Sequence, residues 1–121
     1  MVEIYKEEIN SSGIIYKAEI NASGVKFYMI QNGREVARAR LYLLHNDLHA
    51  EPFGFMEDVF IDETLRGKGY GSKLVNAVLA EAQERGCYKL ICTSRHTKPH
   101  VHKLYKKLGF KNHGIEYRID L

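Results

Sequence analysis

The order of apolar and polar residues predicts strands in the first half of the chain and alternating strands and helices in the second half. Up to about residue 61, apolar residues recur at every second position, and turn-forming residues separate these runs. Asn32-Gly33 is typical of a tight hairpin turn, because both central residues of that turn need positive φ. A second turn is expected at Ala22-Ser23-Gly24, and a polar loop at residues 45–52 leads to another strand over residues 53–61.

The clearest strand runs from Val36 to Leu44 and is expected to bury only one of its faces. Its apolar face carries Ala37, Ala39, Leu41 and Leu43. Its opposite face carries Arg38, Arg40 and Tyr42. This alternation predicts a half-buried antiparallel strand.

After residue 71 the apolar period becomes that of a helix. Its stripe consists of Leu74, Val75, Val78, Leu79 and Ala82, and the helix is expected to end at Gly86. Residues 88–94 predict a short buried strand. A second helix is expected between Pro99 and Gly109, with Val101, Leu104, Tyr105 and Leu108 on its apolar side. Residues 115–121 predict a last strand.

This order of elements is an antiparallel meander followed by β-α-β-α-β. It predicts one α+β domain over residues 1–121, with a mixed sheet covered by helices. The 45% hydrophobic and 27% charged residues fit a globular protein. The apolar runs are too short to cross a bilayer, so we expect a cytoplasmic protein. Cys87 and Cys92 have the spacing of neither a redox pair nor a zinc site, and reduced thiols are expected.

Positive charge is concentrated between Arg95 and Lys111, although the formal net charge of the chain is only +3. This segment holds six Lys or Arg, three His and no acid, so either a phosphorylated ligand or nucleic acid would suit it. His96, His100 and His102 lie close together in sequence, but Pro99 interrupts them and no acidic or cysteine ligand adjoins them. We therefore expect no metal site.

The stretch "LRGKGYGSKL", residues 65–74, places three glycines among cations, between a strand and a helix. Such a loop offers free backbone N–H groups and the positive end of a helix dipole, which together bind phosphate. It is not a P-loop, because no lysine followed by Ser or Thr stands at the required place. A dinucleotide-binding fingerprint is also excluded, because Ser72 stands where the third glycine belongs.

"RGKGYG" does match the R-x-x-G-x-G signature that binds the acetyl-CoA pyrophosphate in the GNAT acetyltransferase superfamily, with Arg66, Gly69 and Gly71 at its fixed positions. "KLYKKLGF", residues 103–110, is similar to a second signature of that family, in which a tyrosine precedes the glycine by four residues. The resemblance runs from about Glu57 to Phe110. It implies a GNAT-like mixed sheet and acetyl-CoA as cosubstrate.

The resemblance also implies where acetyl-CoA would bind. Two parallel strands would splay apart, and the pantetheine arm would bind the first of them through Val59 and Ile61, with Phe60 between. Backbone amides would hold the pyrophosphate; they belong to Arg66, Gly67, Lys68, Gly69, Tyr70, Gly71 and Ser72. The 3′-phosphate would lie near Lys98, Arg95 or Lys103. The family often has asparagine where this chain has Lys98, so the usual pantetheine contact of that asparagine does not carry over.

Two catalytic residues follow from the same resemblance. Glu57 aligns with the glutamate that serves as general base in many members, and Tyr105 with the tyrosine that protonates the departing thiolate. As neighbours on a strand, Glu57 and Asp58 are expected to point to opposite faces, with Glu57 on the face of Val59 and Ile61. Asp58 is the alternative base.

The resulting hypothesis is an N-acetyltransferase, in which a primary amine attacks acetyl-CoA directly in a ternary complex. A CoA-binding regulatory domain without catalysis and a basic nucleic-acid-binding module are the alternatives. The pattern does not identify the acceptor amine, which could be a small molecule or a protein. Family members usually have helices after the first strand, and this sequence has no helical period there. The acceptor site is therefore expected to be open or completed by a second subunit, which favours a homodimer.

Overall fold

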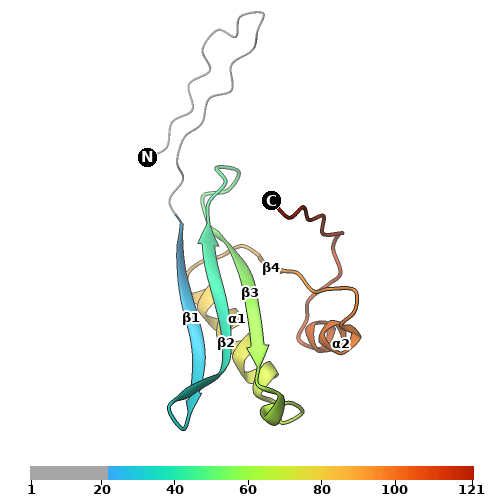
Figure 1. The fold of residues 1–121 in the computed structure, drawn as a ribbon. Helices are drawn as coiled ribbons and strands as arrows, with labels where there is room; N and C mark the ends of the chain where they lie inside the picture. The colour runs from blue at the N-terminus through green and yellow to red at the C-terminus, as the bar shows by residue number, and fades with distance from the viewer. Residues whose placement is uncertain (1–21) are drawn as a thin grey trace, which may run out of the picture.

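A computed structural model describes residues 22–121 and contains a four-stranded mixed sheet with two α-helices (Figure 1). The strands are β1 (Ser23–Gln31), β2 (Arg34–Leu44), β3 (Phe53–Ile61) and β4 (Leu90–Cys92). They lie in the order β1-β2-β3-β4, and the first three are antiparallel while β4 runs parallel to β3. A short 3₁₀ helix, η1 (Glu63–Leu65), leads to α1 (Tyr70–Glu84), and α2 (Pro99–Lys107) follows β4.

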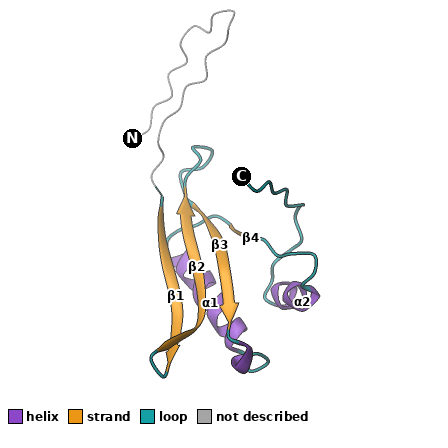
Figure 2. Ribbon diagram, in the orientation of Figure 1, coloured by secondary structure: helices purple, strands orange, loops and turns teal. Residues whose placement is uncertain are grey.

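The core lies between the sheet and α1, which runs along one face of β1, β2 and β3 (Figure 2). The predicted apolar face of β2 is confirmed, because Ala37, Ala39 and Leu41 are fully buried and Leu43 is nearly so. Helix α1 contributes Leu74, Val75, Val78 and Ala82 to the same core, as its stripe predicts. Helix α2 joins through Tyr105, with Leu104 and Leu108 packed at the margin of the core.

The hairpin turn between β1 and β2 is confirmed, since Asn32 and Gly33 both have positive φ, at 53° and 74°. The turn predicted at Ala22-Ser23-Gly24 is wrong, because Ser23 and Gly24 pair with β2 inside β1. A Cβ atom on Gly24 would lie 2.9 Å from the Leu41 carbonyl oxygen, so close strand packing accounts for this glycine. The strands expected before residue 22 lie outside the described residues.

The last strand predicted by the sequence is also wrong, because residues 111–121 form neither a strand nor a helix. Their alternating apolar residues Ile115, Tyr117, Ile119 and Leu121 are all at least 72% exposed. An isolated alternating segment becomes a strand only where a neighbouring strand accepts its hydrogen bonds, and residues 22–121 place none beside it. The strand expected over residues 88–94 is shortened to Leu90–Cys92.

Strand β4 pairs with β3 along its whole short length and then ends. Their pairing covers Gly54 to Met56 on β3, whereas β3 itself continues to Ile61. Beyond Met56 no other described strand replaces β4 at this edge. The backbone of β3 therefore has an open edge next to the end of β4, where the resemblance predicts the splay.

A β-bulge interrupts β3 close to the end of this pairing. Arg40 of β2 is opposite Glu57, but Arg38 is opposite Phe60, so β3 has one more residue than β2 in this interval. Asp58 adopts a left-handed conformation there, with φ of 57°. Because the bulge shifts the alternation of side chains, Val59 and Ile61 pack against the core on the same side as Met56.

Candidate active site

The loop from β3 to α1 is held by interactions at both of its ends. The Asp62 carboxylate accepts hydrogen bonds from the Thr64 backbone N–H and hydroxyl, which starts η1. Arg66 turns back and donates from Nε to the Ile61 carbonyl oxygen at 3.0 Å. The first fixed residue of the R-x-x-G-x-G signature therefore anchors the loop to the end of the strand predicted to carry the pantetheine arm.

The glycines of the loop leave the start of α1 open. Gly67 and Gly69 have φ of 76° and 85°, and no described heavy atom outside the adjoining residues lies within 4 Å of a Cβ built on either. Gly69 is the N-cap of α1, where no described side chain caps the helix. Helical hydrogen bonding begins at the Lys73 N–H, so the three preceding N–H groups of the first turn have no acceptor within the helix. Helix starts of this kind bind anions.

Gly71 differs from the other two glycines. It lies inside α1 and is absent from the positive-φ glycines of the described chain. A Cβ on Gly71 would lie 3.5 Å from Leu104 Cδ2, an ordinary contact distance. This glycine therefore allows α1 and α2 to approach closely and does not need positive φ.

Glu57 and Asp58 lie on the same side of the sheet, so the expectation of opposite faces is wrong. Asp58 contacts Arg38 and Arg40, and the Tyr42 hydroxyl is 3.5 Å from Glu57 Oε1. These three β2 residues share the face that points away from α1. The bulge has the further effect that Glu57 does not share a face with Val59 and Ile61.

Asp58 is poorly suited to act as a base. Arg38 donates to both carboxylate oxygens, at 2.7 and 3.2 Å, and Arg40 also donates to Oδ2. The hydrogen bonds from Arg38, together with the charges of both arginines, hold the pKa of Asp58 below its usual value. Glu57 is exposed and its nearest described partner is the uncharged Tyr42, so it is the better candidate of the two.

Tyr105 is buried on the core-facing side of α2, with 9% of its surface exposed. Its ring packs on Phe110 at 5.4 Å between centroids. Burial, with a smaller effect of the Cys92 thiol at the end of β4, raises the pKa of Tyr105 to about 12. The phenol is therefore protonated, and able to donate a hydrogen bond, throughout the neutral range.

The basic residues predicted for the 3′-phosphate lie on the surface around the start of α2. Lys98 is the N-cap of α2, and its N–H donates to the Arg95 carbonyl oxygen at 3.1 Å. The His102 ring also contacts that oxygen, at 2.8 Å, which fixes the turn before the helix. Arg95, Lys98 and Lys103 are all exposed, so their charges are accessible to a phosphate.

Ser94 is a site candidate that the sequence reasoning missed. It lies two residues after the end of β4, and its hydroxyl oxygen is buried without a hydrogen-bond partner among the described residues. Ligands of open α/β sheets bind beyond the carboxyl ends of the strands, and Ser94 occupies such an end. In the sequence, its position at the end of a predicted buried strand could have marked Ser94 as a candidate.

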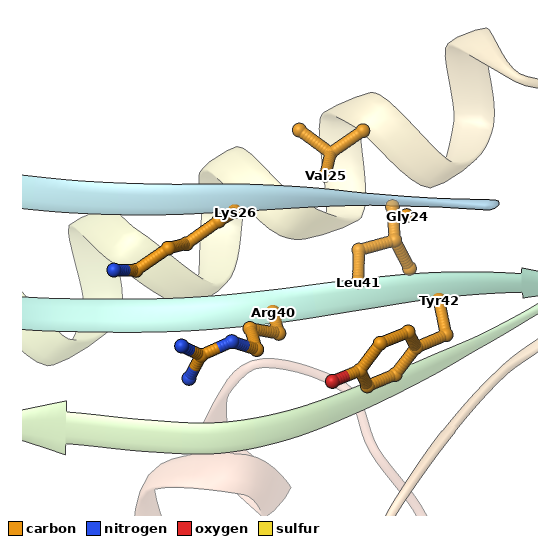
Figure 3. A pocket seen from close by; sticks show the side chains of 6 residues that line it. All are labelled: Gly24, Val25, Lys26, Arg40, Leu41 and Tyr42. Atoms are coloured by element: carbon orange, nitrogen blue, oxygen red, sulfur yellow. The ribbon is translucent and has the colours of Figure 1, made fainter.

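A shallow hollow of about 250 Å³ lies on β1 and β2, lined by Gly24, Val25, Lys26, Arg40, Leu41 and Tyr42 (Figure 3). Figure 3 shows Arg40 and Tyr42 extending from β2 toward β3, where they contact Asp58 and Glu57. The hollow therefore adjoins the two carboxylates on the face away from α1. Within residues 22–121, neither helix has the length and apolar content needed to span a membrane.

Comparisons with known proteins agree with this geometry. Residues 2–110 match the acetyltransferase (GNAT) family. A glucosamine 6-phosphate N-acetyltransferase of Trypanosoma brucei brucei is 38% identical over 69 residues, covering 56% of this chain and 44% of its own length. A D-amino-acid N-acetyltransferase of Saccharomyces cerevisiae is 31% identical over 78 residues, covering 64% of this chain and 48% of its own length. The chain thus spans less than half the length of either relative.

Among solved structures, an acetyltransferase of Trypanosoma brucei superposes with a TM-score of 0.73 at 31% identity, covering 81% of this chain and 69% of that one. The family match covers most of the chain and includes the loop, strands β3 and β4, and Tyr105. This chain therefore belongs to the acetyltransferase (GNAT) family.

Proposed function

We propose that this chain is an N-acetyltransferase that moves the acetyl group of acetyl-CoA to a primary amine. The observation that carries the proposal is the open cradle at the start of α1, where Gly67 and Gly69 have positive φ and the first-turn N–H groups are free. Beside it lies the edge of β3 that β4 leaves unpaired. Phosphates bind to such helix starts, and an extended pantetheine arm can pair with such an edge.

In the reaction proposed here, the neutral amine nitrogen attacks the thioester carbonyl carbon and the C–S bond breaks. The proton that the nitrogen loses on forming the amide passes through water to the departing thiolate, which gives the CoA thiol. An ammonium of pKa near 10.4 must first lose a proton, which costs about 4–5 kcal/mol at pH 7. Glu57 is the proposed acceptor of this proton. A carboxylate is a weak base for an ammonium, so we propose that water relays the proton from the amine to Glu57.

Tyr105 is proposed to donate a hydrogen bond to the departing thiolate. Its pKa of about 12 lies above the value of about 8.5 typical of a thiol, so complete proton transfer from the phenol would be uphill. A hydrogen bond stabilises the thiolate without that transfer. Ser94 could donate a second hydrogen bond, since its hydroxyl has no partner in the described chain.

The proposed acceptor is a small primary amine. The names of the two relatives specify glucosamine 6-phosphate and D-amino acids, both of which carry an amine and an anionic group. The face beside Glu57 exposes Tyr42 in part, so a polar group of an acceptor would meet a hydrogen-bonding hydroxyl there. These two compounds are therefore the first to test.

We further propose that the chain acts as a homodimer. No described helix covers the face that carries Glu57, and the C-terminal segment exposes an alternating apolar row. The row comprises Ile115, Tyr117, Ile119 and Leu121. Such a row is stabilised by pairing with another sheet. Light scattering should give twice the chain mass, and Ile119→Asp should yield monomers; a monomeric wild type at working concentration would contradict the dimer.

Amine-dependent release of CoA thiol tests the proposed activity. The assay would contain acetyl-CoA with glucosamine 6-phosphate, a set of D-amino acids, or no amine. We expect faster thiol release with at least one amine, and mass spectrometry should detect its acetylated product. If acetyl-CoA binds but no amine is acetylated between about pH 6 and 9, the chain is a CoA-binding regulatory domain instead.

A further inference from the structure

The conformation of Asp58 is unusual for its place in the fold. Three residues other than glycine have positive φ in the described chain, namely Asn32, Asp47 and Asp58. Asn32 belongs to a hairpin turn and Asp47 to a loop, but Asp58 lies inside strand β3. The left-handed conformation is unfavourable for most residues with a side chain, and aspartate tolerates it better than most. Contacts of the Asp58 side chain therefore help to decide whether it is adopted inside the strand.

Two arginines from the neighbouring strand supply these interactions. Arg38 donates from Nε to Asp58 Oδ2 at 2.7 Å and from Nη2 to Oδ1 at 3.2 Å, and Arg40 donates to Oδ2 as well. Arg38 is itself held in place, since its guanidinium lies 4.8 Å from the centre of the Phe60 ring. We refer to Arg38, Arg40 and Asp58 together as the bulge clamp.

The bulge determines which way the neighbouring side chains point. Met56 faces the core, so regular alternation would turn Asp58 into the core and place Val59 and Ile61 outside. The extra residue instead keeps Val59 and Ile61 against the core, while Glu57 and Asp58 both remain on the face away from α1. The bulge also begins just beyond Met56, the last β3 residue paired with β4. Bulges bend a strand and increase its twist, so this bulge directs the open edge of β3.

We propose that the bulge clamp is a positioning device for acetyl transfer, in which Arg38 and Arg40 hold Asp58 left-handed and thereby fix the direction of Glu57 and of the open β3 edge. This inference rests on the proposed function. The clamp residues contact neither the amine nor the thioester, and they act through Glu57 and the β3 backbone. The same ion pairs lower the pKa of Asp58, so its carboxylate remains charged at neutral pH.

Kinetics of clamp variants provide the first test. The double variant Arg38→Gln/Arg40→Gln should lower kcat about tenfold or more, because misplaced catalytic groups lose rate steeply. Its Kd for CoA should rise by a smaller factor than kcat falls, since the loop at the start of α1 is intact and only the β3 part of the CoA site is affected. Asp58→Asn should keep most of kcat, because asparagine tolerates positive φ and still accepts a hydrogen bond. Arg85→Gln is the matched control, since Arg85 pairs with Glu81 on α1, away from the clamp.

If the double variant does not fold, two single variants test whether the left-handed conformation of residue 58 is needed for a high kcat. Asp58→Gly removes the carboxylate but adopts positive φ without strain, whereas Asp58→Ala does not. The glycine variant should therefore retain a higher kcat than the alanine variant. Equal kcat values in these two variants would overturn the proposal, as would a folded double variant with wild-type kcat.

A second readout does not depend on turnover. Backbone ¹³C chemical shifts of residue 58 report its left-handed conformation directly. They should show that conformation in the wild type and lose it in Arg38→Gln/Arg40→Gln, while Arg85→Gln leaves it unchanged. If the chemical shifts of residue 58 still indicate the left-handed conformation in the double variant, the proposed role of Arg38 and Arg40 is wrong. If the wild type acetylates no amine, the proposed function fails, but this measurement still decides whether the arginines hold the bulge.

Discussion

Glu57 and Tyr105, the two residues assigned to catalysis, have opposite surroundings. Glu57 is exposed on the sheet face away from α1, and the Tyr42 hydroxyl is its nearest described partner. Tyr105 is buried between α2 and the core, and burial raises its pKa to about 12. Exposure lets Glu57 exchange protons with water, and burial keeps the phenol protonated. The surroundings thus suit a proton acceptor and a hydrogen-bond donor, respectively.

Replacing Glu57 should slow the chemical step and leave cofactor binding unchanged. We expect Glu57→Gln to lower kcat by roughly 10²- to 10⁴-fold, the usual loss when a general base is removed. The rate should recover as pH rises, because more of the amine is then neutral. Glu84→Gln, a change at an exposed position in the last turn of α1, is the control. Full activity of Glu57→Gln from about pH 6 to 9 would show that another group accepts the proton.

Tyr105→Phe should cost less than Glu57→Gln. We expect a loss of about tenfold in kcat, because a hydrogen bond to a charged group contributes about 1.5 kcal/mol or more. The pKa of Tyr105 is raised from 10.0 to about 12, so its protonated form persists well above neutrality. The deficit should therefore be constant between about pH 6 and 9 in a plot of kcat against pH. A deficit that disappears by pH 9 would mean that the phenol ionises within this range.

At the scale of elements, the loop and the start of α1 form one unit that presents backbone N–H groups. Gly67 and Gly69 shape the loop through positive φ, and Arg66 ties it to the end of β3. Gly71 has a different purpose, because its missing side chain lets α2 approach through Leu104. Affinity for CoA should therefore depend on Gly69 through the cradle and on Gly71 through helix packing.

Gly69→Val tests the cradle, and Gly86→Val is its matched control. Both glycines flank α1 with similar φ, at 85° and 77°, and neither has described heavy atoms of other segments within 4 Å of a built Cβ. Both variants should lose a similar amount of stability, since valine is strained at positive φ. Only Gly69→Val should also weaken CoA binding, by tenfold or more, or about 1.4 kcal/mol.

Isothermal titration with CoA and thermal unfolding would separate the two effects. Unchanged CoA affinity in folded Gly69→Val would contradict phosphate binding at the start of α1. An equal loss of affinity in Gly86→Val would mean that general destabilisation, rather than the loop, accounts for the result.

The sequence predicts a structural element well where adjacent residues determine it. Asn32-Gly33, the alternation of β2 and the glycine loop are encoded by adjacent residues, and all three appear in the structure. The bulge at Asp58 is not evident from adjacent residues, because the side-chain partners of Asp58 are Arg38 and Arg40, about twenty residues earlier in the chain. The sequence therefore assigned Glu57 and Asp58 to opposite faces, and the structure places them on the same face.

At the scale of the whole molecule, α1 covers one face of the sheet, while no described helix lies over the other face (Figure 1). The C-terminal apolar row is also exposed. Alternation alone predicted a strand there, but a strand needs a pairing partner, and local sequence does not specify one. The family assignment rests on residues 2–110, whereas the acceptor amine and the dimer remain proposals.

The central claim is that CoA lies along the open edge of β3 with its pyrophosphate at the start of α1. A titration of ¹⁵N-labelled protein with CoA, followed through its backbone amide signals, tests this claim most directly. We expect large shifts at residues 57–61 and 66–72, and little change at the hairpin turn of residues 31–34. Shifts confined to the basic segment of residues 95–111, or no shifts at saturating CoA, would contradict the account.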